Sequence, residues 1–270
     1  MPVINNPAPE LKEIITSPAF RYGQGFFSTT RIINYLPLWL EDHISRLSKS
    51  LADFAMGGFD KTALAAYAGR WPQENHIENG FMRITCWVQA GEVKLFIDGG
   101  KLNGSHDLRG LTVASHHRHS SQPLLKYKSF NYWPNNIAYH NAINRGYYDA
   151  VFLNEKGEIA ETTRCNLFWS HAGKLYTPEL NCGLLPGIAR NKVLYLADQL
   201  GMEVIQGNFP LRQLEQAEEV FLTNSVRGIV GISHFGHQHF YNCPGPVTTK
   251  LIQAYRSLIE EYLNLPPACL

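Results

Sequence analysis

The sequence predicts an α+β fold organised as two domains. In the first half of the chain, short β-branched and aromatic stretches alternate with segments whose apolar residues recur at helical spacing. A polar stretch at residues 115–123 interrupts this pattern, and hairpins and helices follow it. We therefore expect an N-terminal α+β domain over residues 1–115, an interdomain linker over 116–123 and a C-terminal domain over 124–270.

In the first half, a helix is the most clearly marked element. Leu40, Ile44, Leu47 and Leu51 recur at helical spacing, which predicts an amphipathic helix over residues 41–54. The same reasoning predicts the other elements: an irregular Pro-rich start at 1–20, a tight turn at 22–27, strands at 28–35, 80–88, 93–98 and 111–114, a hairpin corner at 35–38 and an Ala-rich helix at 61–69.

In the second half, proline and glycine mark the helix ends. Pro134 suits the first turn of a helix that we expect to run to about Arg145, and Gly201 suits the end of a helix that begins at Ile188. The remaining expected elements are strands at 148–153, 158–161, 166–169, 174–177, 202–206, 220–223 and 229–234, a turn at 154–157, a short helix at 211–216 and a terminal helix at 247–263.

The composition narrows the class of protein. The 270 residues carry a formal net charge of +1 without a basic stripe, which argues against nucleic acid as a partner. No apolar run reaches the roughly 18 residues that a membrane span needs, and residues 1–7 do not resemble a signal peptide. The cysteines are dispersed and indicate reduced thiols in a cytoplasmic protein: Cys86, Cys165, Cys182, Cys243 and Cys269.

Lys128 is the first candidate for chemistry. It lies in Leu124-Leu-Lys-Tyr-Lys-Ser-Phe-Asn-Tyr132, among apolar and aromatic residues. A lysine amine is a nucleophile only when neutral, and burial or a nearby cation lowers its pKa. We expect Lys126 and Lys128 to share one face of an extended segment, so that one lowers the pKa of the other. From spacing alone, an ordinary lysine at a strand end that points to water is the better explanation.

Two segments could bind a phosphate group. Leu185-Pro-Gly-Ile-Ala-Arg190 places free amides at a predicted helix N-terminus, which attracts anions through its N–H groups and dipole. Asn224-Ser225 follows an apolar strand and offers a hydroxyl and amides in a similar way. An ordinary helix start would explain the first segment as well.

Histidines raise the alternative of a metal-binding protein. The candidate ligands are His116, His117, His119, His234, His237 and His239. Because no acids or cysteines stand beside them at ligand spacing, a solvated linker explains the first three better, and we expect no metal.

Six motifs in order resemble one enzyme family. They are Tyr22-Gly-x-Gly-x-Phe27, His43-x-x-Arg46-Leu47, Lys128-Ser-x-Asn131, Glu161-x-x-x-x-Asn-Leu-Phe168, Leu185-Pro-Gly-Ile-x-Arg190 and Phe221-Leu-Thr-Asn-Ser-x-Arg-Gly-Ile229. The set is similar to the fold-type IV, or class IV aminotransferase, enzymes that use pyridoxal 5′-phosphate (PLP). The resemblance implies a two-domain fold like that of D-amino-acid aminotransferase, a C-terminal domain that binds PLP, a small-molecule substrate and a homodimer.

The resemblance also implies roles around the PLP ring. Lys128 matches the lysine that forms a Schiff base with PLP and transfers protons. Glu161 matches the acid that faces the pyridine nitrogen and keeps it protonated. Tyr132 matches a tyrosine that branched-chain aminotransferases direct at the phenolic oxygen. Thr29 stands where lyases of the family often carry threonine on the first strand, and it could assist proton transfer.

Further residues match the family's phosphate site. Arg46 corresponds to the arginine that binds the cofactor phosphate. The amides of Ile188 and Ala189 and the hydroxyl of Ser225 correspond to the rest of that site. Leu185 resembles the residue that packs on the face of the ring. We interpret three neighbouring polar residues as structural: His43, Asn166 as a loop hydrogen bond and Arg190 as a helix-surface charge.

The resemblance leaves the reaction open between two classes. Chain length, Asn166-Leu-Phe-Trp169 and Leu175-Tyr-Thr-Pro178 favour aminodeoxychorismate lyase, which yields 4-aminobenzoate and pyruvate for folate biosynthesis. An aminotransferase for branched-chain or D-amino acids is the alternative, and a non-catalytic PLP carrier is a third. Where relatives often show Thr-Arg-Gly, this chain has Trp87-Val-Gln89, so Arg83 or Arg227 would have to bind a substrate carboxylate.

Overall fold

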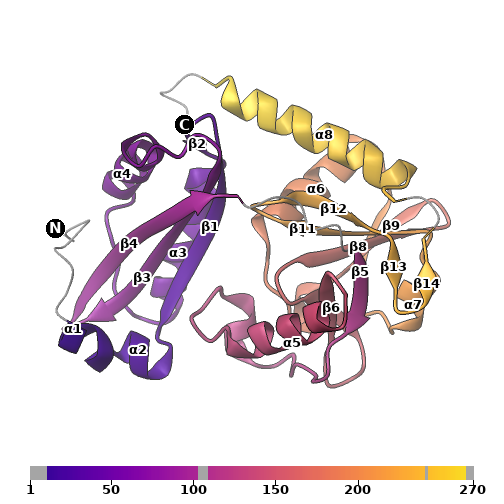
Figure 1. The fold of residues 1–270 in the computed structure, drawn as a ribbon, viewed down its shortest axis with the longest axis horizontal. Helices are drawn as coiled ribbons and strands as arrows, with labels where there is room; N and C mark the ends of the chain where they lie inside the picture. The colour runs from indigo at the N-terminus through magenta and orange to yellow at the C-terminus, as the bar shows by residue number, and fades with distance from the viewer. Residues whose placement is uncertain (1–10, 103–108, 241–242, 266–270) are drawn as a thin grey trace. The chain divides into compact units, whose positions relative to one another are not determined.

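The structure, a computed structural model, describes residues 11–102, 109–240 and 243–265. The chain divides into two compact units (Figure 1). The first holds Met1–Asn103, Tyr127–Asn131 and Ile259–Leu270, and the second holds Gly104–Lys126 and Tyr132–Leu258. Cys269 and the first half of the predicted irregular start, residues 1–10, lie outside the described residues. The cysteines within the described residues are free thiols.

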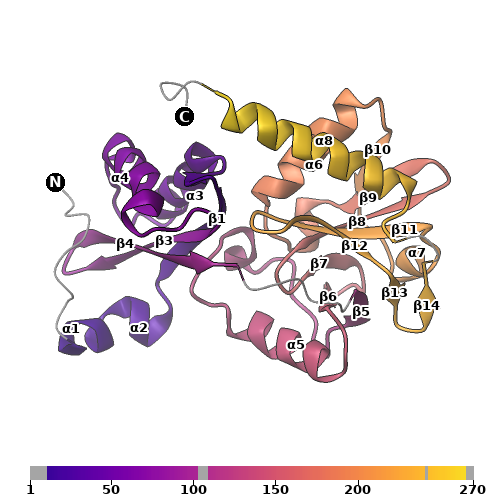
Figure 2. The same cartoon turned by 45° about the horizontal axis from the view of Figure 1, so that its top comes forward.

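The first unit is built on one antiparallel sheet with two helices on one face (Figure 2). The strand order is β2-β1-β3-β4, with β1 at Gly25–Ile33, β2 at Leu36–Pro37, β3 at Gly80–Gln89 and β4 at Glu92–Lys101. The covering helices are α3, Leu40–Asp53, and α4, Lys61–Glu74. The leucines and isoleucine that predicted α3 are buried with alternate residues of β1, β3 and β4 in one core, which confirms the helical prediction.

The beginning of the described chain corrects one prediction. Residues 11–20 were expected to be irregular, but α1 spans Leu11–Thr16 and α2 spans Pro18–Tyr22. Ser17 caps α2, because its hydroxyl accepts a hydrogen bond from the amide of Phe20 at 3.2 Å. The proline that suggested irregular structure therefore stands at the first helical position, where its missing N–H costs nothing.

The second unit contains two five-stranded sheets. The first runs β14-β13-β5-β6-β7, and the second runs β10-β9-β8-β11-β12. The strands in chain order are β5 Gly110–Val113, β6 Asp149–Leu153, β7 Ile159–Thr162, β8 Asn166–His171, β9 Lys174–Pro178, β10 Val204–Gly207, β11 Glu219–Asn224, β12 Gly228–Ile232, β13 His234–Phe235 and β14 Gln238–His239. β5 pairs in parallel with β6, so the strand predicted just before the linker belongs to this unit's sheet.

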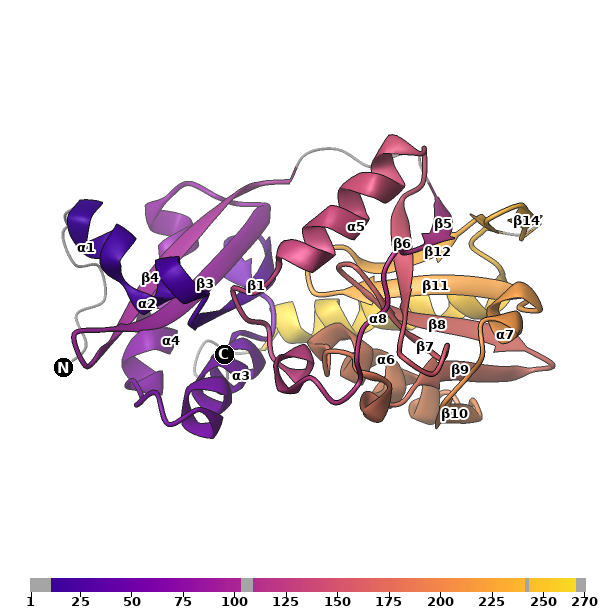
Figure 3. The same ribbon diagram turned by 90° about the horizontal axis from the view of Figure 1, so that it is seen from below.

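Apolar side chains from both sheets form the core of the second unit. Val151 and Ile159 of one sheet pack in the same cluster as Leu167, Trp169 and Val220 of the other. Helices flank the pair of sheets (Figure 3): α5 Trp133–Asn144, α6 Ile188–Gln199, the short α7 Arg212–Glu215 and α8 Pro246–Leu263, whose residues from Ile259 onward belong to the first unit. Two short 3-10 helices complete the unit, η1 at Pro123–Lys126 and η2 at Leu180–Cys182. The mixture of helices and strands confirms the predicted fold class, and none of the described helices is long and apolar enough to cross a membrane.

Candidate active site

The position of Lys128 is fixed by a short segment that pairs with the first residues of β1. The amide of Phe27 donates a hydrogen bond to the carbonyl of Lys128 at 2.9 Å, and Phe26 and Ser129 form an antiparallel bridge. Residues opposite each other in an antiparallel pair point to the same face. Lys128 therefore points to the side of the sheet that carries Phe27, and its Nζ atom lies 4.7 Å from the centre of that ring.

The close approach of this segment explains a glycine in the first motif. Phe130 donates its backbone N–H to the carbonyl of Gly25 at 2.9 Å. A Cβ atom on Gly25 would lie 2.4 Å from the Phe130 ring, so a larger residue here would force that ring to move. The tight turn with close backbone approach, predicted from the glycines, is confirmed.

Lys126 is not the neighbour that the sequence suggested. It is the last residue of η1 and is exposed, rather than part of an extended segment with Lys128. The prediction that the two lysines alternate along one face is therefore wrong. The proline at position 123 and the two leucines after it close a helical turn, which ends just before the pairing with β1 begins.

Thr29 and Arg83 lie on the same face of the sheet as Phe27. Thr29 is two residues along β1 from Phe27, and the strand register sets Arg83 of β3 directly opposite Thr29. The guanidinium carbon of Arg83 lies 5.0 Å from the centre of the Phe27 ring, and its Nε donates a long 3.4 Å hydrogen bond to Thr29 Oγ1. This face therefore presents a lysine, a hydroxyl and an arginine around one aromatic ring.

Arg46 lies behind β1, on the helix-covered face. It donates from Nη2 to Ser28 Oγ at 2.6 Å, and Ser28 also shares a 2.7 Å hydrogen bond with His43 Nδ1. Burial lowers the pKa of Arg46 to about 10, with Asp42 opposing part of that shift. Its Nε atom is buried without a hydrogen-bond partner, and no ion pair of the described chain includes it. A cation in this state is suited to receive an anion.

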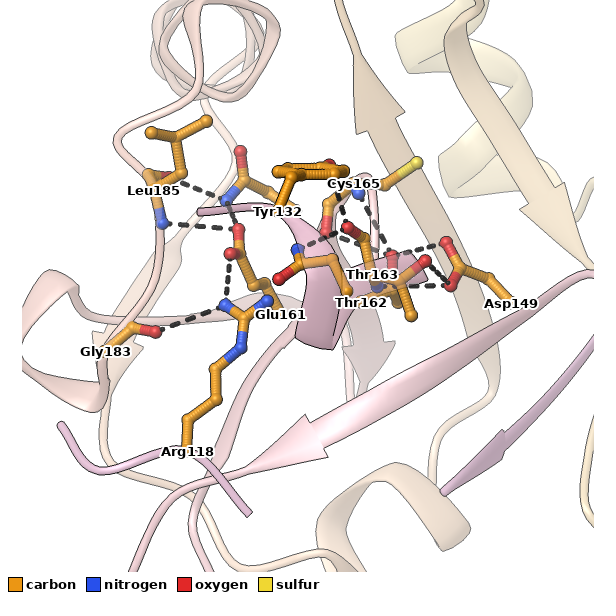
Figure 4. Close-up of polar contacts among 11 residues, drawn as sticks. Arg118, Tyr132, Asp149, Glu161, Thr162, Thr163, Cys165, Gly183 and Leu185 are labelled. Carbon is orange, nitrogen blue, oxygen red and sulfur yellow. Dashed lines mark hydrogen bonds and ion pairs between the residues drawn. The ribbon is translucent and has the colours of Figure 1, made fainter. Parts of the chain in front are cut away.

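In the second unit, Glu161 stands at the end of β7 and is surrounded by donors (Figure 4). Arg118 Nη1 donates to Oε1 in an ion pair between two buried side chains. The amide of Leu185 and the Asn166 side chain each donate to Oε2 at 3.2 Å. These bonds from three donors fix the position of the carboxylate and favour its ionised form.

Arg118 is the site residue that the sequence analysis missed. It stood among histidines in the stretch interpreted as a solvated linker, yet only 8% of its surface is exposed. Its amide donates to the carbonyl of Leu153, and its guanidinium carbon lies 4.0 Å from the centre of the Phe152 ring. The signal that could have found it is Glu161 itself, because a carboxylate expected inside an apolar domain needs a buried cation.

The helix at Ile188 begins with backbone amides that no side chain caps. Gly187 is the N-cap and offers no side chain to the first turn of α6, whose leading amides have no acceptor within the helix. Ile188 and Ala189 are both buried. A Cβ atom on Gly187 would lie 2.0 Å from Asn166 Oδ1, so the motif needs glycine here. Ser225 lies in the turn between β11 and β12.

Asn166 joins this loop to the acid. Its Nδ2 donates to the carbonyl of Leu185 at 2.8 Å as well as to Glu161, which confirms the predicted loop hydrogen bond and adds a contact to the site. The interpretation of Arg190 as a surface charge is wrong. Arg190 is 2% exposed and donates to the carbonyl of Pro178 and to Gln206, which ties α6 to β9 and β10.

Tyr132 precedes α5 and turns its hydroxyl toward the loop after Glu161. The hydroxyl donates to the carbonyl of Thr163 at 2.9 Å. Burial raises the pKa of Tyr132, and the nearby Glu161 raises it further, so the phenol stays protonated at neutral pH. The second unit thus gathers Tyr132, Glu161 and Leu185 with the newly found Arg118. The first unit carries Lys128 and Thr29 on one face of its sheet and Arg46 on the helix that covers the other face.

The histidines of the metal alternative are dispersed. His234 and His239 stack with ring centres 5.3 Å apart. Across residues 11–102, 109–240 and 243–265, however, no group of three or more histidines, cysteines or acids is arranged to hold a metal ion.

Known proteins resemble this chain in sequence and in fold. The profile of the amino-transferase class IV family matches residues 25–235. The chain is 27% identical over 279 residues to the aminodeoxychorismate lyase of Bacillus subtilis, covering 97% of this chain and 95% of the relative. It is 25% identical over 266 residues to the D-alanine aminotransferase of Listeria monocytogenes, covering 93% and 91%. The crystal structure of the Escherichia coli branched-chain amino acid aminotransferase is similar with a TM-score of 0.85 and 25% identity, covering 90% of this chain and 88% of that one.

The chain therefore belongs to the class IV aminotransferase family. Members of this family depend on PLP, so the protein is a PLP-dependent enzyme, either a lyase or an aminotransferase.

Proposed function

We propose that the protein is an aminodeoxychorismate lyase, which converts 4-amino-4-deoxychorismate to 4-aminobenzoate and pyruvate for folate biosynthesis. The observation that carries the proposal is the common face of Lys128 and Thr29 on β1, with Arg83 opposite Thr29. Similarity to the Bacillus subtilis lyase over nearly the whole of both chains supports it. The sequence Asn166-Leu-Phe-Trp169, which resembles lyases of the family, supports it as well.

The residues of this chain fit PLP. Arg46 has a buried Nε atom without a partner, as expected of an arginine whose natural partner is a phosphate. The uncapped amides of Ile188 and Ala189 offer further donors at a helix N-terminus, and we assign the Ser225 hydroxyl to the same group. Glu161, held by Arg118, would face the pyridine nitrogen. Leu185 would pack against the ring.

PLP, when bound, supplies a carbonyl carbon that condenses with amines and a protonated ring that draws electrons from the carbon bearing the amine. Lys128 would hold the cofactor, and its free Nζ would take the proton from the carbon that bears the substrate amine. Thr29 donates its hydroxyl proton to the methylene carbon of the departing three-carbon group, which becomes pyruvate. Lys128 returns its proton to Thr29, so the proton count closes without water.

Two cations remain for substrate carboxylates. Arg83 is exposed on the face that carries Lys128, and its guanidinium already lies against Phe27. We assign Arg83 to a substrate carboxylate in preference to Arg227, whose backbone amide is held by Asn224 Oδ1 in a turn of the second unit. We also propose a cytoplasmic homodimer, on the basis of the family resemblance and the free thiols of the described chain.

One observation favours an aminotransferase for branched-chain or D-amino acids as the second candidate. Tyr132 matches the tyrosine that branched-chain aminotransferases direct at the cofactor's phenolic oxygen, and its protonated hydroxyl lies close to Glu161 in the second unit. An aminotransferase would use the same Lys128 to move the proton to the cofactor instead of expelling pyruvate.

The two activities separate in one experiment. Purified protein loaded with PLP is incubated with 4-amino-4-deoxychorismate, and 4-aminobenzoate fluorescence and pyruvate are followed together. A parallel panel of branched-chain and D-amino acids is assayed for keto acid formation, with Lys128→Ala as the control for both. We expect equal amounts of 4-aminobenzoate and pyruvate, and neither product with the control variant. Keto acids without pyruvate would instead identify an aminotransferase.

A further inference from the structure

The acid Glu161 lies beside a turn that carries the chain from one sheet to the other. β7 belongs to the sheet that contains β6, and β8 belongs to the sheet that contains β11. The connection, which we call the sheet-switch turn, is Thr162–Cys165. The amide of Thr162 donates to the carbonyl of Cys165, and the amide of Cys165 donates to Thr162 Oγ1. Glu161 and Asn166 flank this turn and are hydrogen-bonded to each other.

The buried carboxylate of Asp149, which lies outside the turn, accepts hydrogen bonds from it. Asp149, the first residue of β6, is 2% exposed. Its Oδ1 accepts from the amide of Thr163 at 3.1 Å, from Thr163 Oγ1 at 2.6 Å and from the amide of Ala150 at 2.7 Å. Its Oδ2 accepts from Thr162 Oγ1 at 2.8 Å (Figure 4). All four partners are donors, so an ionised carboxylate satisfies each of them.

No cation compensates this buried charge within the described chain. Asp149 takes part in none of its ion pairs, which lie elsewhere. Burial raises the pKa of Asp149, while the hydroxyl and amide donors of the sheet-switch turn oppose that shift. The hydrogen bonds that favour the charged form of this carboxylate therefore come from the turn and from the amide of Ala150, and the turn is in return tied to β6 at two successive residues.

Thr163 also contacts Tyr132. The carbonyl of Thr163 accepts from the Tyr132 hydroxyl at 2.9 Å and from Asn135 Nδ2 at 2.7 Å. Thr163 thus connects Asp149 on one side to the start of α5 on the other. A change in the position of Thr163 would move the Tyr132 hydroxyl, and a change at Thr162 would move Glu161, its direct neighbour in the chain.

We propose that Asp149 is a positioning residue of the cofactor site, which fixes Glu161 and Tyr132 through its hydrogen bonds to Thr162 and Thr163. The inference rests on the proposed function in one respect, namely that Glu161 faces the pyridine nitrogen. Asp149 touches neither the cofactor nor the substrate. Its effect is on how well Glu161 keeps that nitrogen protonated and on how tightly PLP binds.

The test uses changes in the turn that keep its size. Thr163→Val removes the hydroxyl bond to Asp149, and Thr163→Ser keeps it. The matched control is Thr177→Val, which removes an equally buried hydroxyl bond, the 2.8 Å contact to the Leu167 carbonyl on the other sheet. Each full-length protein is prepared without PLP and titrated with PLP that carries ¹⁵N at the ring nitrogen. The dissociation constant and the ¹⁵N chemical shift, which reports the protonation of the nitrogen, are measured together with the unfolding temperature of the apoprotein.

We expect Thr163→Val to weaken PLP binding about tenfold, in the range found when outer partners of a bound group's ligands are removed. It should also move the ¹⁵N shift toward that of neutral pyridine. Thr163→Ser and Thr177→Val should keep the wild-type shift and dissociation constant, even if Thr177→Val lowers the unfolding temperature as much.

Two outcomes overturn the inference, and they differ. If Thr163→Val keeps the wild-type ¹⁵N shift and binds PLP as well as Thr177→Val does, while Glu161→Gln does move the shift, Asp149 and its turn have no positioning role. If Glu161→Gln leaves the ¹⁵N shift unchanged, or the wild type binds no PLP, the pairing of Glu161 with the ring fails first. That second result removes the basis of the proposed function itself.

Discussion

Replacing Arg118 tests whether its buried ion pair stabilises the charged carboxylate of Glu161. Arg118→Met keeps an unbranched apolar stem of similar length but leaves Glu161 charged, with the Leu185 amide and Asn166 as its remaining donors among the bonds described above. Both members of the pair are less than a tenth exposed, at 8% and 7%. Removing one member of such a pair costs about 3–5 kcal/mol, because the other charge stays buried.

This loss of unfolding free energy can be measured by urea denaturation. With a urea dependence of about 3 kcal/mol/M for a large unfolding unit, the midpoint of the apoprotein should fall by roughly 1 M or more. The double variant Arg118→Met, Glu161→Gln removes both charges, and we expect it to recover much of the loss. If Arg118→Met shifts the midpoint no more than an exposed arginine change does, or the double variant is less stable than the single one, the pair does not hold Glu161 as described.

Three other perturbations follow from single sites. Arg46→Met should leave the apoprotein as stable as the wild type while weakening PLP binding by about 10–100-fold in a binding titration, the equivalent of one charged hydrogen bond; unchanged affinity would exclude a phosphate contact. Gly187→Ala should lower unfolding stability by about 1–3 kcal/mol because its Cβ meets an amide oxygen at 2.0 Å, whereas Gly69→Ala, with open space around it in α4, should stabilise by up to about 1 kcal/mol. Burial raises the pKa of Cys165 to about 12, so disulfide-reagent labelling of native protein at pH 8 should reach the exposed Cys243 well before the buried Cys165; fast labelling of Cys165 at pH 8 would contradict its burial.

Local patterns predicted most of the elements well. The apolar residues spaced along 41–54 predicted α3, observed at Leu40–Asp53, because one face of that helix alone meets the sheet. The helix predicted to begin after Leu185-Pro-Gly is observed at Ile188–Gln199, with Gly187 as its N-cap. These features depend on neighbours in the sequence and can be read from it.

Long-range pairing was beyond the reach of the sequence. Nothing local shows that Lys128 pairs with Phe27, a hundred positions earlier, or that η1 separates it from Lys126. Arg118 was overlooked for the same reason, because its partner Glu161 is distant in the chain and its neighbours are exposed histidines. Family resemblance selected Lys128 and Glu161 as members of a common motif set, but only the register of strands and turns shows which residues support them.

The central claim is that Lys128 is the residue that holds PLP, and reduction with borohydride tests it most directly. Protein incubated with PLP is reduced, digested and mapped by mass spectrometry. Lys126, two residues before Lys128, serves as the internal comparison. We expect a phosphopyridoxyl group on Nζ of Lys128, and no such group anywhere in the Lys128→Ala protein. Modification of Lys126 instead, or an unmodified Lys128 in protein that retains PLP, would contradict it.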